Sequence, residues 1–185
     1  PLESEYLAPL PAEIDLRLVV TDMDGTLIDG DGHVPVGLDE VVARMREAGI
    51  IFAPASGRQL ANLRAVLGHV VDDSPLIAES GALAVHGNEE IHSDTISAGE
   101  ASAAIATARE LASSGYDVGT VVACKRCAYI ERSDPAFLAQ ARLYYAALEI
   151  VDDLMTIPLD EVLKVAVFDF DDIENGSSQA LAAAV

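Results

Sequence analysis

The chain has 185 residues, 51 % of them apolar, which is enough for one compact domain or a core with a modest insertion and excludes a disordered or fibrous protein. Thirty-one acidic residues against 11 basic ones give a net charge of −20, so the average field opposes binding to nucleic acid or to an anionic membrane, and we expect neither partner. The chain also lacks the ~18-residue apolar run of a membrane span and the basic start of an export signal, so the cytoplasm is the expected compartment.

The first half of the chain alternates predicted strands with predicted helices. Residues 1–15, with three prolines, favour a loosely docked tail. Apolar runs then predict buried strands, and amphipathic spacing predicts helices, in the order 16–21 (strand), 38–48 (helix), 49–56 (strand), 58–67 (helix) and 75–80 (strand). This order favours an open parallel sheet, whose ligands lie beyond the carboxyl ends of the strands. Asp22 and Ser56 each fall at such an end, so we expect them to meet at one rim.

The regular alternation stops after Gly81. The following residues predict a hairpin that turns at Gly87-Asn88 and an alanine-rich helix over roughly 98–113. A second α+β unit is predicted from a hairpin over 118–132, a helix over 135–147, a strand over 163–170 and a last helix after Asn175. We therefore divide the chain near Ser97 into a tail (1–15), an α/β unit (16–96) and an α+β unit (97–185).

The two cysteines, Cys124 and Cys127, are too few for a disulfide framework, and no histidine lies at metal-site spacing from them. A structural role is favoured, in which they flank a hairpin turn at Lys125-Arg126. A redox or metal-binding role is the alternative.

The segment most informative about chemistry is Asp22-Met23-Asp24-Gly25-Thr26-Leu27, directly after a predicted buried strand. Carboxylates at alternate positions share a face of a strand end, where they would repel each other without a cation. A divalent cation that prefers oxygen ligands, above all Mg²⁺, relieves this repulsion and brings a phosphate with it. Aspartates that merely stabilise a loop are the alternative interpretation.

Other acidic motifs fit the sequence less well. An EF-hand calcium loop that begins at Asp22 would need glycine and glutamate where Leu27 and His33 stand. A loop that begins at Asp29 reaches Glu40 at its twelfth position, but Val34 occupies the required glycine position. The chain has no G-x-x-x-x-G-K-[ST] segment, which argues against a nucleotide hydrolase of the P-loop type.

The string DMDGTLID, followed by Ala55-Ser56-Gly57-Arg58 at the end of the second strand, resembles the haloacid dehalogenase (HAD) superfamily of phosphohydrolases. The ASGR form, the AESGA stretch of residues 78–82 and the large α+β unit after the third strand are similar to the Cof-type branch with a type IIB cap. Sugar-phosphate phosphatases and phosphomannomutase-like enzymes share that branch. From about Leu16 onward, the resemblance implies an α/β HAD-like Rossmannoid core with a parallel sheet, and an α+β cap domain inserted after the third core strand.

The resemblance also implies a function, that of a magnesium-dependent phosphatase acting on a small phosphorylated metabolite, with a sugar phosphate favoured. It makes Asp22 the nucleophile that forms an aspartyl-phosphate, and Asp24 the general acid and base. Mg²⁺ would be held by the Asp22 carboxylate and the Asp24 backbone carbonyl. Ser56 and Gly57 would bind the transferring phosphoryl group, and Arg58 would either contact the substrate or pair with a surface acid. A phosphomutase of the same superfamily and a catalytically silent binding module are the alternatives.

The chain departs from the family pattern in several places. Ser80 stands where the family usually has asparagine, and the core lysine and G-D-x-x-[ND] segment that follow the cap in this branch are not found. Lys164 lies in a strand that the resemblance places in the cap, so a structural or cap-side role is favoured. Asp169, Asp171 and Asp172 lack a preceding Gly-Asp pair and favour a solvated strand end. We therefore expect the sequence to stop within its cap, as a piece of a longer protein, and to have little turnover by itself.

Overall fold

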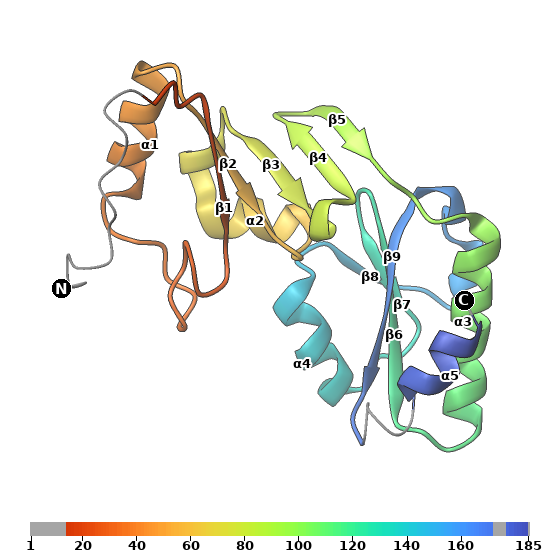
Figure 1. The fold of residues 1–185 in the computed structure, drawn as a ribbon. Helices are drawn as coiled ribbons and strands as arrows, with labels where there is room; N and C mark the ends of the chain where they lie inside the picture. The colour runs from red at the N-terminus through yellow and green to blue at the C-terminus, as the bar shows by residue number, and fades with distance from the viewer. Residues whose placement is uncertain (1–13, 172–176, 185) are drawn as a thin grey trace.

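A computed structural model describes residues 14–171 and 177–184 of the chain, which are arranged around two β-sheets (Figure 1). The strands of the first sheet lie side by side in chain order: β1 (Leu18–Asp22), β2 (Ile51–Ala55), β3 (Pro75–Ala78), β4 (Leu83–His86) and β5 (Glu89–Ser93). The first three run parallel, as predicted, and β4 and β5 form an antiparallel hairpin that extends the sheet. The α/β class with a parallel sheet is thus confirmed, with an antiparallel edge added.

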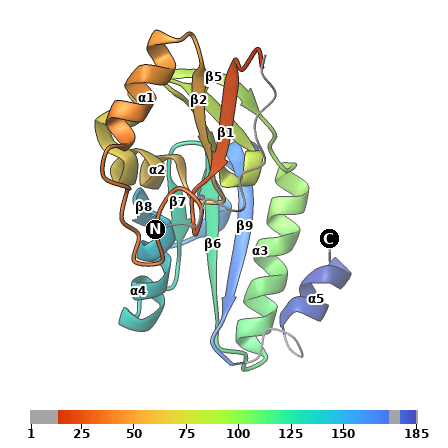
Figure 2. The ribbon, with the colours of Figure 1, turned by 60° about the vertical axis from the view of Figure 1, so that its left-hand side comes forward.

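Two helices connect the parallel strands: α1 (Leu38–Glu47) and α2 (Leu60–Leu67). Both lie on one face of the first sheet (Figure 2), because consecutive parallel strands are joined by crossovers of the same hand. Val42 of α1 and Leu63 of α2 share a buried cluster with Phe52 of β2. The first unit, defined as β1–β5 with α1 and α2, therefore has its core under these helices. Leu18 and Val20 of the edge strand β1 are half exposed.

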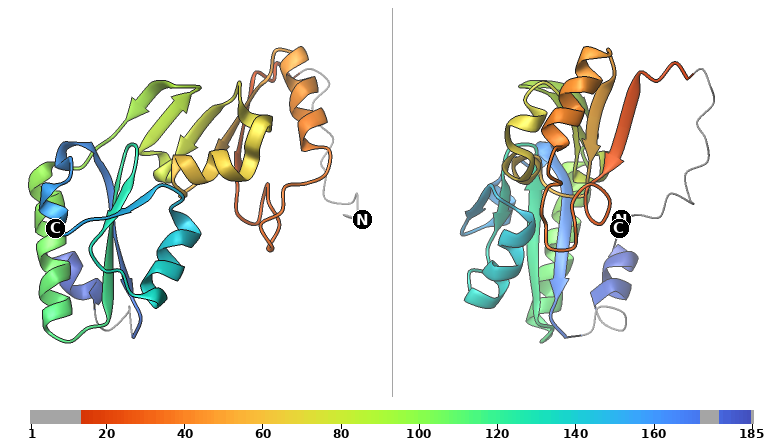
Figure 3. Two further views of the ribbon diagram at one scale, coloured as in Figure 1. Left: turned by 180° about the vertical axis from the view of Figure 1, so that it is seen from behind. Right: turned by 90° about the vertical axis from the view of Figure 1, so that its left-hand side faces the viewer.

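The second sheet has the strand order β8-β7-β6-β9. Its strands are β6 (Val118–Cys124), β7 (Ala128–Ile130), β8 (Leu148–Ile150) and β9 (Val162–Asp169), and its helices are α3 (Ala98–Ser113), α4 (Pro135–Tyr144) and α5 (Ser177–Ala184). Helices α3 and α4 cover opposite faces, and α5 lies beside α3 (Figures 1 and 3). Adjacent residues of β6 point to opposite faces of this sheet: Val122 packs in a cluster with Ile105 of α3, and Val121 packs in a cluster with Phe137 of α4. We call β6–β9 with α3–α5 the second unit.

Short helical turns complete the chain: η2 (Gly68–Val71), η3 (Glu79–Gly81), η4 (Leu154–Thr156) and η5 (Leu159–Glu161). In the parts of the chain that the structure describes, no helix combines the length and apolarity that a membrane crossing requires. Most of the predicted tail, residues 1–13, lies outside the described residues.

Helix boundaries follow the local capping chemistry. The predicted helix over 98–113 has those bounds, and Ser97 and Glu100 form a reciprocal capping box at its start. The predicted helix over 135–147 is wrong at its end, because Tyr145 is extended (φ −122°, ψ 103°) and the next residues lead into β8. The predicted helix start at Arg58 is also wrong, because α2 begins at Leu60 after an extended Gln59.

Cys124 and Cys127 flank the predicted hairpin turn, closed by a 3.0 Å hydrogen bond from the Cys124 N–H to the Cys127 carbonyl. Both thiols are free. Burial raises the pKa of Cys124 to about 12, so its thiol stays protonated at neutral pH. These observations favour the structural role.

Several side chains of the first unit contact the second, among them those of Gln59 and Glu90. The Gln59 amide both donates to the Ala147 carbonyl, at 2.8 Å, and accepts from the Ala147 N–H, at 2.9 Å. Lys125, in the turn after β6, pairs with Glu90 of β5 at 2.9 Å. The boundary near Ser97 stays a prediction.

Candidate active site

The candidate site lies where β1 and β2 end. Their parallel register pairs Asp22 with Ala55, so Ser56 begins the loop directly beside the Asp22 strand end, as predicted. The Asp22 residue is exposed. Among residues 14–171 and 177–184, no group donates a hydrogen bond to its carboxylate, so the carboxylate oxygens are available to a ligand or a cation.

The turn after β1 fixes the second aspartate. The Met23 carbonyl accepts hydrogen bonds from the N–H groups of Leu27, at 3.0 Å, and Ile28, at 2.9 Å. Met23 and Ile28 are buried, whereas Asp22 and Asp24 on either side of Met23 are exposed. The two aspartates therefore lie at alternate positions around a buried residue, the arrangement that the sequence predicted.

Asp24 forms an ion pair with Arg58. The guanidinium donates from Nε at 2.9 Å and from Nη2 at 2.5 Å to the two carboxylate oxygens, and its Nη1 donates to Asn62 Oδ1 at 3.0 Å. The hydrogen bonds from Arg58 lower the pKa of Asp24, against a smaller opposing effect of burial. Of the two alternatives for Arg58, the structure shows the pairing with an acid, and that acid is the predicted proton-transfer residue.

The Ser56–Arg58 loop is tied to the turn that follows β3. The Glu79 N–H donates to the carbonyl of the last loop residue, and the Ser80 N–H donates to the carbonyl of the first, both at 3.0 Å. Glu79 and Ser80 have positive φ angles of 50° and 59°, which are costly for residues with a side chain. A Cβ on Gly57 would lie 3.2 Å from Ser80 Oγ, so glycine permits this close approach.

The same contacts determine where the loop can bind a ligand. A trans peptide points its C=O and N–H in opposite directions, so the Gly57 N–H points away from the turn that holds the Ser56 carbonyl. Within the described ranges this N–H has no acceptor. The Ser56 hydroxyl oxygen accepts from the Arg58 N–H at 3.2 Å, which leaves its own O–H free to donate. Such donors suit a phosphoryl group, and the roles of Ser56 and Gly57 stay predictions.

Lys164 reaches this loop from β9 of the second unit. Its Nζ lies 2.5 Å from Glu79 Oε2 and donates to the Gly57 carbonyl at 3.1 Å. The Glu79 side chain is 1 % exposed, and no described group makes a well-aligned hydrogen bond to either carboxylate oxygen, so Lys164 is its charge partner. Burial disfavours the ammonium, but the contacts with Glu79 and Tyr145 outweigh it and raise the pKa of Lys164.

No role is predicted for Glu79 from the sequence. The available signal was a carboxylate directly after a short buried strand, the same signal that identified Asp22. For Lys164 the sequence favoured a structural or cap-side role, and the structure places its side chain against the candidate phosphate-binding loop as well.

The chemistry of the donor set around Asp22 fits Mg²⁺. Asp22 offers an exposed carboxylate, and the carbonyl of Asp24, two positions along the chain, accepts no hydrogen bond from any described group. Oxygen donors of these two kinds are the ligands that Mg²⁺ prefers, usually with several waters. Asp22 and Asp24 are therefore the residues that would hold the ion.

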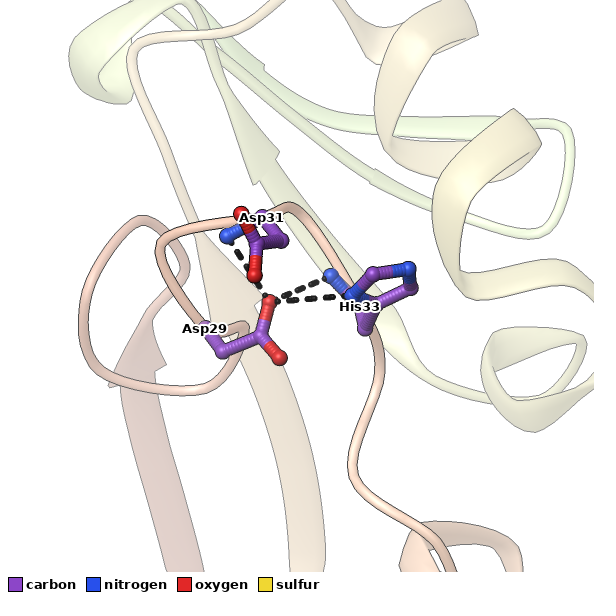
Figure 4. Close-up of side chains that lie close together, drawn as sticks. All are labelled: Asp29, Asp31 and His33. Atoms are coloured by element: carbon purple, nitrogen blue, oxygen red, sulfur yellow. Dashed lines mark hydrogen bonds and ion pairs between the residues drawn. The ribbon is translucent and has the colours of Figure 1, made fainter.

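A second acidic group lies in the following loop and has a simpler explanation. The ligand atoms of Asp29, Asp31 and His33 lie within 4.8 Å of one another (Figure 4). Asp29 Oδ1 accepts the N–H of Asp31 at 3.0 Å and that of His33 at 2.8 Å, so it stabilises a turn. All three residues are exposed, and these contacts alone account for the cluster.

The acidic residues at the end of β9 lie away from the candidate site. Asp169, the last residue of the strand, accepts N–H groups from Asp171, at 3.0 Å, and Ser177, at 3.4 Å. Lys164 stands near the other end of the strand. Asp172 lies outside the described residues.

Comparison with known proteins identifies relatives of the chain. The sequence profile of a haloacid dehalogenase-like hydrolase family matches residues 19–183. An HMP-PP phosphatase of Escherichia fergusonii is 30 % identical over 163 residues, which cover 85 % of this chain and 56 % of that protein. A 5-amino-6-(5-phospho-D-ribitylamino)uracil phosphatase of Escherichia coli is 27 % identical over 142 residues, which cover 76 % and 51 %. The chain thus spans about half the length of the curated relatives it matches.

Solved structures share the fold. A HAD subclass IIB sugar phosphatase superposes with a TM-score of 0.68 at 18 % identity, over 91 % of this chain and 63 % of that one. A haloacid dehalogenase-like hydrolase from Bacteroides thetaiotaomicron gives a TM-score of 0.67 at 19 % identity, over 91 % and 61 %. At these identities the likeness establishes the fold. The resemblance and the fold class expected from the sequence are confirmed.

Proposed function

This chain belongs to the haloacid dehalogenase-like hydrolases, and from that membership we propose that it supplies the nucleophile and phosphate-binding loop of a magnesium-dependent phosphatase. The observation that carries the proposal is the exposed Asp22 carboxylate, which no described group hydrogen-bonds, beside a loop whose Gly57 N–H has no described acceptor. A nucleophile must be free to meet phosphorus, and a phosphoryl group needs such donors. The substrate is a small phosphorylated metabolite, and the sugar phosphatase among the structural neighbours supports a sugar phosphate.

The proposed reaction has two steps. An Asp22 oxygen attacks phosphorus, the bond from phosphorus to the leaving oxygen breaks, and Asp24 donates a proton to the leaving alkoxide. Asp24 then takes a proton from a water molecule whose oxygen attacks the aspartyl-phosphate, which breaks the bond to Asp22 and releases phosphate. Mg²⁺, when bound, neutralises negative charge on the phosphoryl oxygens and on Asp22.

The Arg58–Asp24 ion pair favours the form of Asp24 that the second step needs, and its loss moves the carboxyl toward the form that the first step needs. An ionised Asp24 is ready to accept the proton in the second step, and Arg58 favours that form. The first step needs a protonated Asp24. An arriving phosphate competes for the guanidinium, because Arg binds phosphate through the same fork of N–H donors that now binds the carboxylate. Loss of the pair then returns the pKa of Asp24 toward its ordinary value.

Hydrolysis of p-nitrophenyl phosphate by the full-length protein, with and without Mg²⁺, tests the proposed function. Turnover should require Mg²⁺ and should fall by about 10³-fold or more in Asp22→Asn, because the amide cannot attack phosphorus. Asp31→Asn is the matched control, since Asp31 is an exposed aspartate of the adjoining loop, and it should keep the parent rate. Full activity in Asp22→Asn contradicts the proposal, and an inactive parent protein favours the silent binding module. Transfer of phosphate to a second sugar hydroxyl instead of water identifies a phosphomutase.

A further inference from the structure

All three carbonyl groups of the Ser56–Arg58 loop are bound, but by different parts of the chain. The first and last are held by the backbone of the Glu79–Ser80 turn, within the first unit. The middle carbonyl, that of Gly57, accepts from Lys164, which is 107 positions away in β9. The second unit therefore supplies one of the three contacts that orient this loop.

The contact to the middle carbonyl determines the direction of the next N–H. The peptide between Gly57 and Arg58 is planar and trans, so its N–H points away from Lys164. That N–H donates to Ser56 Oγ at 3.2 Å and so orients the hydroxyl group of the predicted phosphate ligand. Gly57 has no side chain to restrict this peptide, which makes the external contact more important.

The ammonium group is itself held in place. Lys164 Nζ contacts the buried Glu79 carboxylate at 2.5 Å and lies 5.5 Å from the centre of the Tyr145 ring, and Tyr145 is buried. Glu79 belongs to the turn that binds the other two loop carbonyls. A single cation thus connects the second unit to both the loop and the turn that supports it.

We propose that Lys164 is a positioning residue of the phosphatase, which couples the placement of the second unit to the orientation of the Ser56–Arg58 loop. This inference rests on the proposed function for its catalytic consequence. When the second unit is seated, Lys164 holds the Gly57 carbonyl and the loop donors face the phosphoryl site. When the unit moves away, the middle carbonyl loses its donor and the buried Glu79 carboxylate loses its charge partner.

The test compares Lys164→Met with Lys164→Arg and with Lys125→Met in the full-length protein. Lys125 is the matched control, because it also joins the second unit to an acid of the first, Glu90, but does not contact the loop. Lys164→Met should lower kcat by about 10- to 100-fold with little change in KM, because a misplaced donor costs transition-state binding. Lys164→Arg should restore most of the rate, and Lys125→Met should keep kcat within about twofold of the parent, since exposed ion pairs contribute little.

A double variant separates positioning from stability. Lys164→Met alone leaves the buried Glu79 carboxylate without a charge partner and can impair folding. The double variant Glu79→Gln/Lys164→Met removes both charges. The double variant should recover thermal stability relative to Lys164→Met but keep the low kcat. A folded double variant with the parent kcat overturns the proposal.

A readout that does not depend on turnover keeps this inference distinct from the proposed function. The backbone amide resonances of Gly57 and Arg58, recorded by NMR with and without Mg²⁺ and inorganic phosphate, should shift in Lys164→Met and in the double variant but not in Lys125→Met. If the parent protein hydrolyses no phosphate ester, the proposed function fails, but these resonances still show whether the orientation of the loop depends on Lys164. Resonances that are unchanged in both Lys164→Met and the double variant overturn the proposed coupling.

Discussion

Arg58 holds both carboxylate oxygens of Asp24 through two different nitrogens, at 2.9 and 2.5 Å, although the residues lie 34 positions apart in the sequence. The Arg58 side chain is 22 % exposed and that of Asp24 is 57 % exposed, so the pair lies at the surface of the first unit, open to an incoming anion. An arginine that follows the second strand therefore favours the ionised form of an aspartate that follows the first.

We expect Arg58→Met to raise the pKa of the Asp24 carboxyl toward its ordinary value, because the hydrogen bonds that favour its ionised form are lost. A carboxyl ¹³C NMR titration measures this directly and does not depend on activity. Arg64→Met is the control, since Arg64 lies in the following helix α2 and contacts the Gly87 carbonyl. An Asp24 titration curve that stays in place in Arg58→Met would show that the pair does not set its protonation.

Gly119→Ala should destabilise the second unit. A Cβ at this position would overlap the ring of Phe137, which is fully buried between β6 and α4 and has no room to withdraw. Such overpacking costs about 1–3 kcal/mol of unfolding free energy. The matched control is Gly99→Ala on α3, where the atom nearest to the new Cβ would be 3.9 Å away. This change should raise the unfolding free energy by at most about 1 kcal/mol, because alanine favours a helix more than glycine does. Urea denaturation measures the unfolding free energy of both variants. A Gly119→Ala variant as stable as Gly99→Ala would contradict the packing around Phe137.

The start of α4 should make stability depend on pH. Asp134 caps the helix by accepting the Phe137 N–H at 3.2 Å, and its hydrogen bond from Arg132 lowers the pKa of the carboxyl. A lowered pKa in the folded state gives a contribution to stability that is complete above the ordinary pKa and is lost as the pH falls through the lowered one. Asp134→Asn keeps a capping side chain but not the charge.

Thermal melts of the parent protein and Asp134→Asn should therefore differ most near neutral pH and converge below about pH 4. Asp152→Asn, which removes an aspartate charge at an exposed position, is the control. A gap between the Asp134→Asn and parent curves that widens toward acid would refute this account of the helix start.

Local chemistry in the sequence was sufficient to predict several elements. The alanine-rich run predicts the helix over 98–113 at both ends, and the Ser97–Glu100 capping box that starts it needs no tertiary contact. The end of α4 was not found, because the extended conformation of Tyr145 coincides with its burial beside Lys164 and with the pairing of β8 to β7. Neither contact can be inferred from helical periodicity.

The candidate site can also be predicted only in part, because some of its contacts follow from local sequence and others depend on tertiary packing. Parallel strands end at a common edge, so Asp22 and Ser56 were expected together, and the register of β1 with β2 has that consequence. The approach of Lys164 to Gly57 depends on how two separate sheets pack, and no periodicity or spacing within either unit encodes it. The left-handed conformation of Glu79 was hidden as well, because a non-glycine residue rarely adopts it.

The side-chain amide of Gln59 imitates a backbone, since it gives one hydrogen bond to Ala147 and takes one from the same residue. These two hydrogen bonds allow only one alignment of the segment around Ala147 against Gln59. Sliding the facing segment by one residue would break both bonds at once, because neighbouring N–H and C=O groups point in opposite directions. Whenever the two halves of the molecule come together, this contact should therefore select one alignment and reject those shifted by a residue.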